Sequence, residues 1–208
     1  NYYALDYSSR LLSIFKDLPH CGEILTEDDE QQIPSFFKLI QEIIEDRKKL
    51  FKKLSVDSYE TANKRQKIPL IIVIIDNLSG LSSSKIGENY VYHLSDMLKT
   101  SINYGIKFII SINHLNEAPL RVRQEMTDCI TFHMKDRYDY SEALGIRCQY
   151  EPPVIPGRGL IVYKDEALEW QAGMYKPYTD EEKRLNCLKK EIQDMSLQYQ
   201  NKRKAKSF

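Results

Sequence analysis

The stretch Ile68-Pro-Leu-Ile-Ile-Val-Ile-Ile-Asp76 decides the fold of this 208-residue chain. It is a run of aliphatic, mostly β-branched residues that a single acid ends, and this pattern is typical of a central parallel strand buried on both faces. A second run, Ile106-Lys-Phe-Ile-Ile-Ser-Ile-Asn-His114, follows a helix expected at residues 88–103, and Gly105 is expected to form the C-terminal turn of that helix. Strand, helix and strand of these lengths predict a right-handed βαβ unit in a parallel sheet.

The residues upstream extend this architecture. The pattern of residues 1–6 predicts another strand, residues 22–25 a short edge strand, and the apolar spacing of residues 28–54 a long amphipathic helix. The basic end of this helix has two interpretations, a phosphate-binding patch or cations that suit a helix C-terminus and a solvated face, and the second is favoured. Its members are Arg47, Lys48, Lys49, Lys52 and Lys53.

The residues downstream predict shorter elements. Residues 129–134 alternate weakly like a strand, residues 138–144 indicate a helix, and residues 159–163 and 167–171 predict a hairpin that ends the parallel core in an antiparallel edge. The pair Thr179 and Glu182 is a capping-box pattern for a final helix. Four cations beyond that helix indicate a solvated tail or linker: Lys202, Arg203, Lys204 and Lys206.

Composition limits the classes of function. The 30 Lys and Arg residues balance 30 Asp and Glu residues, which argues against a strongly nucleic-acid-binding surface. A net charge of zero is nevertheless compatible with local clusters of basic residues. The four cysteines are scattered without a CxxC pair, which favours idle thiols in a reducing compartment over zinc ligands or disulfides. No apolar run approaches the roughly 20 residues of a membrane span. One soluble, cytosolic domain is expected, and the start without Met or a signal sequence predicts a fragment whose preceding element lies upstream.

Polar residues end the two predicted central strands, at the edge where open α/β sheets bind ligands. They are Asp76, Asn77, Asn113 and His114. An acid directly after several aliphatic residues is the Walker B pattern, in which a buried strand aims a carboxylate at a magnesium ion and its water shell. An Asp that only caps a strand or begins a turn is an alternative of comparable weight. A working Walker B usually continues with Glu, whereas position 77 is Asn, whose amide cannot act as a base.

The other chemical signals are weaker. A phosphate-cradling loop GxxxxGK[ST] is absent, because none of the eight glycines precedes Lys. In a fragment this loop is expected upstream of Asn1, whereas in a complete chain hydrolysis is not expected. Arg121 and Arg123, on a short helix that Pro119 opens, are candidates to reach a phosphate in a neighbouring subunit, with ordinary surface charge as the favoured alternative. The four histidines lie too far apart in sequence to predict a metal or Ser-His-Asp cluster.

Several segments together carry a resemblance to a known family. In chain order they are Asn1–Asp6, Leu18-Pro-His20, Asp46–Phe51, Leu70–Asn77, Gly105–Asn113, and Pro156-Gly-Arg-Gly-Leu160 ahead of Leu168–Gln171. Their order and spacing, over essentially the whole chain, resemble FtsK/SpoIIIE-type ATPase domains and most closely the ATPase modules of the EssC/EccC proteins of type VII secretion. The Pro-Gly-Arg-Gly segment and the neutral charge favour this secretion branch over the DNA-pumping branch.

The resemblance implies a fold and a site. The fold is an α/β, RecA-like P-loop NTPase core over residues 1–178, mainly a parallel sheet flanked by helices with an antiparallel edge hairpin, followed by a C-terminal helix and basic linker over residues 179–208. The Walker A element would precede Asn1. Asp76 would be the Walker B acid that holds Mg²⁺ through water, Asn77 would stand in the place of the catalytic Glu, and Asn113 would be the polar sensor. ATP and Mg²⁺ are the implied cofactors.

The resemblance also implies a function. Because position 77 departs from an active motor, it implies a degenerate module, inactive alone, that serves nucleotide binding, regulation or docking of secreted WXG100-type substrates. The implied partners are neighbouring ATPase modules of the same chain, those substrates and further copies in a hexamer, whereas DNA is not expected. The implied location is the cytoplasm, within a chain anchored to the bacterial membrane. A DNA translocase motor is the alternative function, and a structural spacer is a third.

Overall fold

The computed structural model describes residues 1–175, 180–199 and 204–207. The chain divides into two compact units, Asn1–Glu125 with Asn186–Phe208, and Met126–Leu185, which we call the first and second unit. The predicted domain boundary between residues 178 and 179 falls outside the described residues and stays a prediction. Thr179 of the predicted capping box lies outside them as well.

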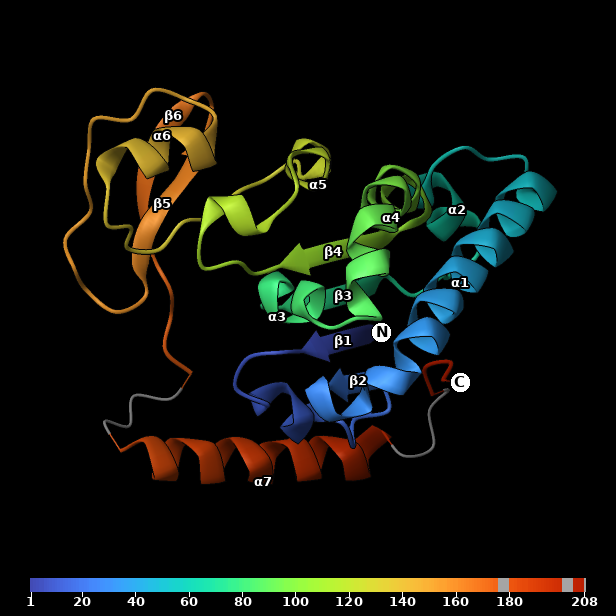
Figure 1. The fold of residues 1–208 in the computed structure, drawn as a ribbon. Helices are drawn as coiled ribbons and strands as arrows, with labels where there is room; N and C mark the ends of the chain where they lie inside the picture. The colour runs from blue at the N-terminus through green and yellow to red at the C-terminus, as the bar shows by residue number, and fades with distance from the viewer. Residues whose placement is uncertain (176–179, 200–203, 208) are drawn as a thin grey trace. The chain divides into compact units, whose positions relative to one another are not determined.

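The first unit is built on a parallel sheet of four strands (Figure 1). Their spatial order is β2 (Cys21–Thr26), β1 (Tyr2–Asp6), β3 (Ile71–Asp76) and β4 (Ile106–Ile110), and each neighbouring pair is parallel. The stretch Ile68–Asp76 therefore supplies a central strand of the sheet, β3, as predicted. Its burial alternates, because Ile71, Val73 and Ile75 are buried whereas Ile72 and Ile74 are only half-buried. The expectation of full burial on both faces thus holds for one face.

The long predicted helix begins later than expected. A 3₁₀ segment, η2 (Glu27–Gln32), comes first, and α1 spans Ile33–Leu54. The Thr26 backbone N–H and hydroxyl both donate to the Asp29 carboxylate, at 2.9 and 3.0 Å, and Asp29 itself has non-helical backbone angles. The acids of residues 27–30 therefore lie in the separate turn η2, which this capping interaction stabilises. The regular helix starts only after that turn, at Ile33.

The crossover from β3 to β4 contains more helices than the sequence predicted. It consists of α3 (Leu78–Ser83), α4 (Gly87–Ser101) and a 3₁₀ turn, η3 (Ile102–Tyr104). Gly105 ends it in the left-handed conformation at φ 68°, as predicted. A Cβ at this position would lie 2.2 Å from the Tyr59 ring, so glycine is required for space as well as for conformation.

Arg47 differs from the cations that follow it on α1. Its side chain was predicted to belong to a solvated basic face, but the residue is only 6% exposed. Its guanidinium donates to three backbone carbonyls: the Gly105 oxygen at 2.9 Å and the oxygens of Tyr104 and Pro69. This part of the prediction is wrong, because these carbonyls lie at the end of η3 and in the segment before β3, where a buried charge finds enough acceptors.

Short helical elements complete this part of the first unit. They are η1 (Leu11–Phe15), α2 (Tyr59–Arg65), η4 (Leu115–Glu117) and α5 (Leu120–Glu125). The last confirms the short helix expected after Pro119. β4 ends at Ile110, earlier than predicted, because the backbone N–H groups of Asn113 and His114 bond to the Glu117 carboxylate, at 2.8 and 3.2 Å, instead of continuing the ladder.

The C-terminal residues bind back to the first unit. The final helix is α7 (Glu181–Tyr199), of which Ile192 is buried. Beyond it, the Tyr3 hydroxyl donates to the Lys206 carbonyl at 2.8 Å, and the Lys206 ammonium pairs with Glu42 at 3.2 Å. Lys206 is therefore bound to the first unit although it stays exposed, Lys204 is exposed as a solvated tail predicts, and Lys202 and Arg203 lie outside the described residues.

The second unit is a hairpin packed on one helix. β5 (Arg158–Tyr163) and β6 (Glu166–Gln171) pair antiparallel, and their inner side packs on α6 (Arg137–Leu144). The predicted hairpin is confirmed, as a separate two-stranded sheet rather than a continuation of the parallel one. The weak strand predicted at residues 129–134 is reduced to a single bridge between Ile130 and Ile161. A Cβ on Gly159 would overlap the Thr131 carbonyl oxygen, at 1.7 Å, which explains the second glycine of the Pro-Gly-Arg-Gly segment.

Candidate functional site

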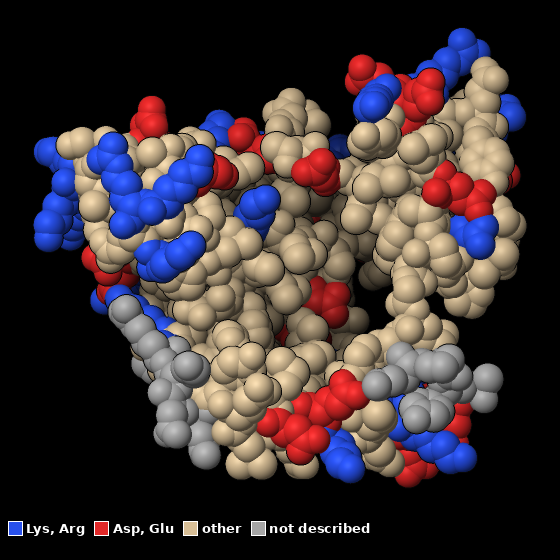
Figure 2. All heavy atoms as spheres, turned by 180° about the vertical axis from the view of Figure 1, so that it is seen from behind, with Lys and Arg blue, Asp and Glu red and all other residues tan. Residues whose placement is uncertain are grey.

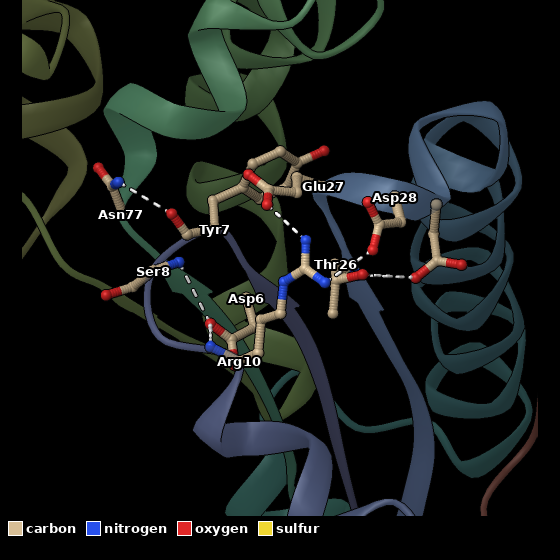
Figure 3. A network of polar contacts seen from close by, with 9 residues as sticks. Asp6, Tyr7, Ser8, Arg10, Thr26, Glu27, Asp28 and Asn77 are labelled. Carbon is tan, nitrogen blue, oxygen red and sulfur yellow. Dashed lines mark hydrogen bonds and ion pairs between the residues drawn. The ribbon is translucent and has the colours of Figure 1, made fainter.

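The parallel register aligns polar residues at the carboxyl edge of the sheet in the first unit. Asp6 of β1 lies opposite both Thr26 of β2 and Asp76 of β3. Ile75 lies opposite Ile110, so Ser111 follows β4 at the level of Asp76. In-register parallel strands present their last side chains at one edge, which is where ligands of open α/β sheets bind. Figure 3 shows part of this edge, with the loop after β1 and the start of η2.

Asp76 is held by the residue that follows β4. The Ser111 hydroxyl donates to Asp76 Oδ1 at 2.6 Å and accepts from the Asn77 backbone N–H at 2.8 Å. Within the described residues, the second carboxylate oxygen of Asp76 accepts no hydrogen bond. One oxygen is therefore fixed by the protein, while the other remains available to a water molecule or a cation.

Asn77 has a structural role in the loop after β3. Its backbone is left-handed, at φ 67°, a conformation that Asn adopts more readily than most residues. Its side-chain amide donates to the Tyr7 carbonyl at 3.0 Å (Figure 3). Its side-chain oxygen accepts from the Gly80 N–H at 3.3 Å as the N-cap of α3. A Glu at this position would lose both the cap and the favourable backbone. The Asn77 amide is thus bound to the fold through both its nitrogen and its oxygen.

The sequence did not reveal Asp6 as an organiser of the same edge. This acid is 1% exposed, and its carboxylate accepts from the backbone N–H groups of Ser8, Arg10 and Leu12 at 3.0–3.2 Å. The signal was present, because Asp6 ends an apolar strand just as Asp76 does. The backbone bonds fix the loop after β1, so the buried carboxylate shapes the edge rather than facing a ligand.

A charged bridge closes this loop on its outer side. Arg10, left-handed at φ 59°, pairs with Glu27 at 2.5 Å and with Asp28 at 2.8 Å (Figure 3). These two carboxylates raise the pKa of the Arg10 guanidinium. On the inner side, burial and the nearby Glu30 raise the pKa of Tyr7 to about 12. The loop is therefore held by the Arg10 ion pairs on its outer side and by the hydrogen bond from the Asn77 amide to the Tyr7 carbonyl on its inner side.

The other predicted site residues lie apart from Asp76. Asn113 is exposed two residues beyond Ser111, so Ser111 is the residue after β4 that contacts the acid. The guanidinium of Arg121 lies over the Tyr92 ring, 4.8 Å from its centroid, which attaches it to α4. Arg123 is half-buried on α5. The structure brings Asp76 and Asn77 together with Ser111 and does not show a contact from Asn113, Arg121 or Arg123 to them.

The residues at this edge fit the magnesium-binding half of a nucleotide site but not its phosphate-binding half. Within the described ranges there is no group of three or more His, Cys, Asp or Glu side chains that could hold a metal ion. A magnesium ion at this edge would need Asp76, water and phosphate oxygens, which is the usual arrangement for this cation. The free Asp76 oxygen fits that requirement. The phosphate-cradling half is not present in these 208 residues, and the start of α3 is already capped by Asn77.

The described helices differ from those that cross a lipid bilayer. None of them combines the length and the apolar character needed to span one.

Known proteins resemble the chain over almost its whole length, although no family model matches it. The ESX secretion system protein EccC of Geobacillus thermodenitrificans is 26% identical over 203 residues, which are 97% of this chain and 14% of that protein. The solved structure of EssC ATPases 2 and 3 from the same species has a TM-score of 0.86 at 26% identity, and covers 100% of this chain and 39% of its own. A structure of Thermomonospora curvata EccC, ATPases 2 and 3 in complex with a signal sequence peptide, has a TM-score of 0.76 at 20% identity and covers 95% of this chain and 36% of its own.

The TM-scores show that the fold of the chain is shared with these solved structures. The chain spans only a small part of the curated relative that it matches. The relatives of this chain are the EssC and EccC proteins of type VII secretion, and its fold is that of their ATPase modules.

Proposed function

We propose that this chain is a degenerate ATPase module of a type VII secretion motor, which regulates the motor or recognises its substrates instead of hydrolysing ATP rapidly. The observation that carries the proposal is the state of Asn77. Its amide stands where an active module would carry a catalytic Glu, and both ends of that amide are bound, to Tyr7 and to Gly80. A side chain in this state neither accepts a proton from water nor moves toward it.

Nucleotide binding is the part of the proposal that depends on Asp76. The carboxylate, fixed by Ser111 on one oxygen, would hold the water shell of a magnesium ion on the other. ATP with Mg²⁺ is the cofactor that this arrangement suits. The bound group would supply the phosphate oxygens, while the chain would supply the acid and the fixed loop after β1. Asn113 would act as the sensor, and Arg121 and Arg123 would face the phosphate of a neighbouring module.

The proposed partners follow from the relatives. EccC ATPases 2 and 3 occur as adjacent modules, and one such structure contains a signal sequence peptide. We therefore propose that this chain adjoins further ATPase modules of one polypeptide, in a hexameric motor on the cytoplasmic side of the membrane that anchors it. Its substrates would be secreted proteins of the WXG100 type, recognised through their signal sequences.

The test is ATP turnover by the full-length protein. We expect Asp76→Ala to leave steady-state hydrolysis within about twofold of the unchanged protein, because other modules would perform the chemistry, a change below about 0.4 kcal/mol in activation free energy. The exposed acid Asp57 serves as a matched control, through Asp57→Ala. Abolished turnover in Asp76→Ala, with normal turnover in the control, would contradict the degenerate assignment.

Binding measurements separate the remaining alternatives. Calorimetry with a secreted substrate should show binding, whereas a structural spacer would bind neither the substrate nor ATP. Tight binding of duplex DNA that weakens steeply with salt would instead indicate a DNA translocase.

A further inference from the structure

A corner of the first unit carries a dense positive charge that the neutral total conceals. Between Arg47 and Lys67 the chain has eight cationic residues and two acidic ones, Asp57 and Glu60. Six of the cations are exposed, and we call them the basic corner: Lys49, Lys52, Lys53, Lys64, Arg65 and Lys67. Figure 2 shows Lys and Arg side chains gathered over the end of α1 and over α2.

The lysines of this corner face solvent without partners in the described part of the chain. Lys48, beside them, pairs with Glu45 at 2.7 Å, but the five lysines of the corner form no ion pair there. Lys49, Lys52 and Lys53 are spaced three and four residues apart, so they share one side of α1. The C-termini of α1 and α2 offset part of the mutual repulsion, yet the charge itself remains directed outward.

The corner rests on a rigid base. Phe51, Ala62 and Ile68 form a buried cluster that joins α1, α2 and the start of the β3 segment. The Arg65 guanidinium donates to the Leu54 carbonyl and so attaches the end of α2 to the end of α1. The positive charges are therefore presented together, on one fixed surface.

The position of this surface is separate from the candidate site. Arg47, two residues before Lys49 of the corner, bonds to the carbonyls of Pro69 and Gly105, which precede β3 and β4. The corner thus lies at the amino-terminal edge of the sheet, whereas Asp76 lies at the carboxyl edge. A ligand at the corner would leave the Asp76 edge free.

We propose that the basic corner binds the anionic headgroups of a lipid surface. Lysine supplies a compact point charge suited to a field of phosphates, and lacks the planar fork that reads bases or single phosphates. No side chain in the corner offers an exposed aromatic ring for stacking on nucleic-acid bases, because the nearby Tyr59 packs in the buried cluster and its hydroxyl donates to the Ile68 carbonyl at 2.9 Å. Leu70, 37% exposed beside the corner, adds an apolar contact for the headgroup region.

The experiment is vesicle flotation with the 208-residue chain. The vesicles contain equal parts of phosphatidylglycerol and phosphatidylcholine, and pure phosphatidylcholine vesicles form the neutral arm. The variant is Lys49→Gln/Lys52→Gln/Lys53→Gln. The matched control, Lys135→Gln/Lys189→Gln/Lys190→Gln, removes the same charge from exposed lysines elsewhere. Circular dichroism of both variants is the check that they fold.

We expect binding to the anionic vesicles only. The corner variant should lose about 100-fold in affinity, because each lysine near an anionic surface contributes roughly fivefold, whereas the control should lose less than about threefold. Raising the ionic strength from about 0.1 M to about 1 M should abolish binding, since the Debye length falls from about 10 Å to about 3 Å.

Three results would overturn the inference. The first is a chain that does not float with anionic vesicles. The second is an equal loss in the two variants, which would show that net charge and not this surface matters. The third is tighter binding of duplex DNA than of the vesicles through the same lysines, which would make the corner a nucleic-acid surface. None of these results bears on Asp76 or Asn77, so the proposed function is tested independently.

Discussion

Removing the buried guanidinium of Arg47 is the perturbation with the largest expected effect on the first unit. Arg47→Met keeps most of the side-chain volume but takes away the donor that serves the carbonyls of Tyr104, Gly105 and Pro69. It also removes the cation that lies 5.9 Å from the centre of the Tyr59 ring. Through these three carbonyls Arg47 joins α1 to the segments that enter β3 and β4, so the packing of both strands depends on this contact.

The magnitude follows from the number of acceptors left behind. A buried polar group without a partner costs about 1–3 kcal/mol, and deleting one side of a buried charged interaction costs about 3–5 kcal/mol. Relief of the desolvation of the guanidinium and the apolar packing of Met offset part of this cost. We expect a net loss of about 3 kcal/mol, a large share of the roughly 5–15 kcal/mol that stabilises a typical domain. Arg47→Lys should lose about 2 kcal/mol, because a point charge cannot bridge three carbonyls as a planar fork does.

The assay must report on the first unit separately. Native-state hydrogen exchange of the β3 and β4 amides provides this report, while the fluorescence of Trp170, the only tryptophan of the chain, follows the second unit. Lys49→Met, an exposed neighbour, is the control and should change stability by less than about 0.5 kcal/mol. A loss below about 1 kcal/mol in the β3 amides, or an equal shift of the Trp170 transition, would refute this account of Arg47.

Three further predictions concern single residues. Asn77→Ala should cost about 1–2 kcal/mol in chemical denaturation, because it removes the cap of α3 and strains a left-handed backbone; Asn77→Gly should recover the strain but not the cap, and equal losses would contradict the cap. Burial raises the pKa of the Cys21 thiol to about 11 from about 8.5 in an unfolded chain, so this group stabilises the fold below about pH 8.5 and loses that contribution as the pH rises to about 11. A pH titration of stability in Cys21→Ala should therefore be flatter in that window than in the unchanged chain. Tyr3→Phe should release the segment around Lys206, seen as faster proteolytic trimming of the C-terminus, and unchanged trimming would mean that this hydrogen bond does not hold it.

The candidate site could be predicted only in part from the sequence. Asp76 and Asn77 were identified because an acid after an aliphatic run ends a strand whatever surrounds it. Asp6 ends a strand in the same way but was missed, because nothing in the sequence tells that its carboxylate turns back onto three backbone N–H groups. Ser111 was missed because it lies inside an apolar run, and only the register of β3 and β4 brings its hydroxyl to Asp76.

The sequence by itself determined the main elements of this protein, although it did not predict α3 and it predicted a strand where only the bridge at Ile130 forms. Hydrophobic periodicity specified the parallel strands, the amphipathic helices and the hairpin, and glycine specified the left-handed turn at Gly105, because these features depend on residues close together in the chain. Only the tertiary structure decided the long-range polar contacts. Arg47 became a buried donor instead of a surface charge, the Lys206 carbonyl accepts a hydrogen bond from the Tyr3 hydroxyl, and Asn77 became the cap of α3 and a donor to the Tyr7 carbonyl. The reason is that a polar side chain satisfies whichever partner the fold brings within about 3 Å, and that partner lies far away along the chain.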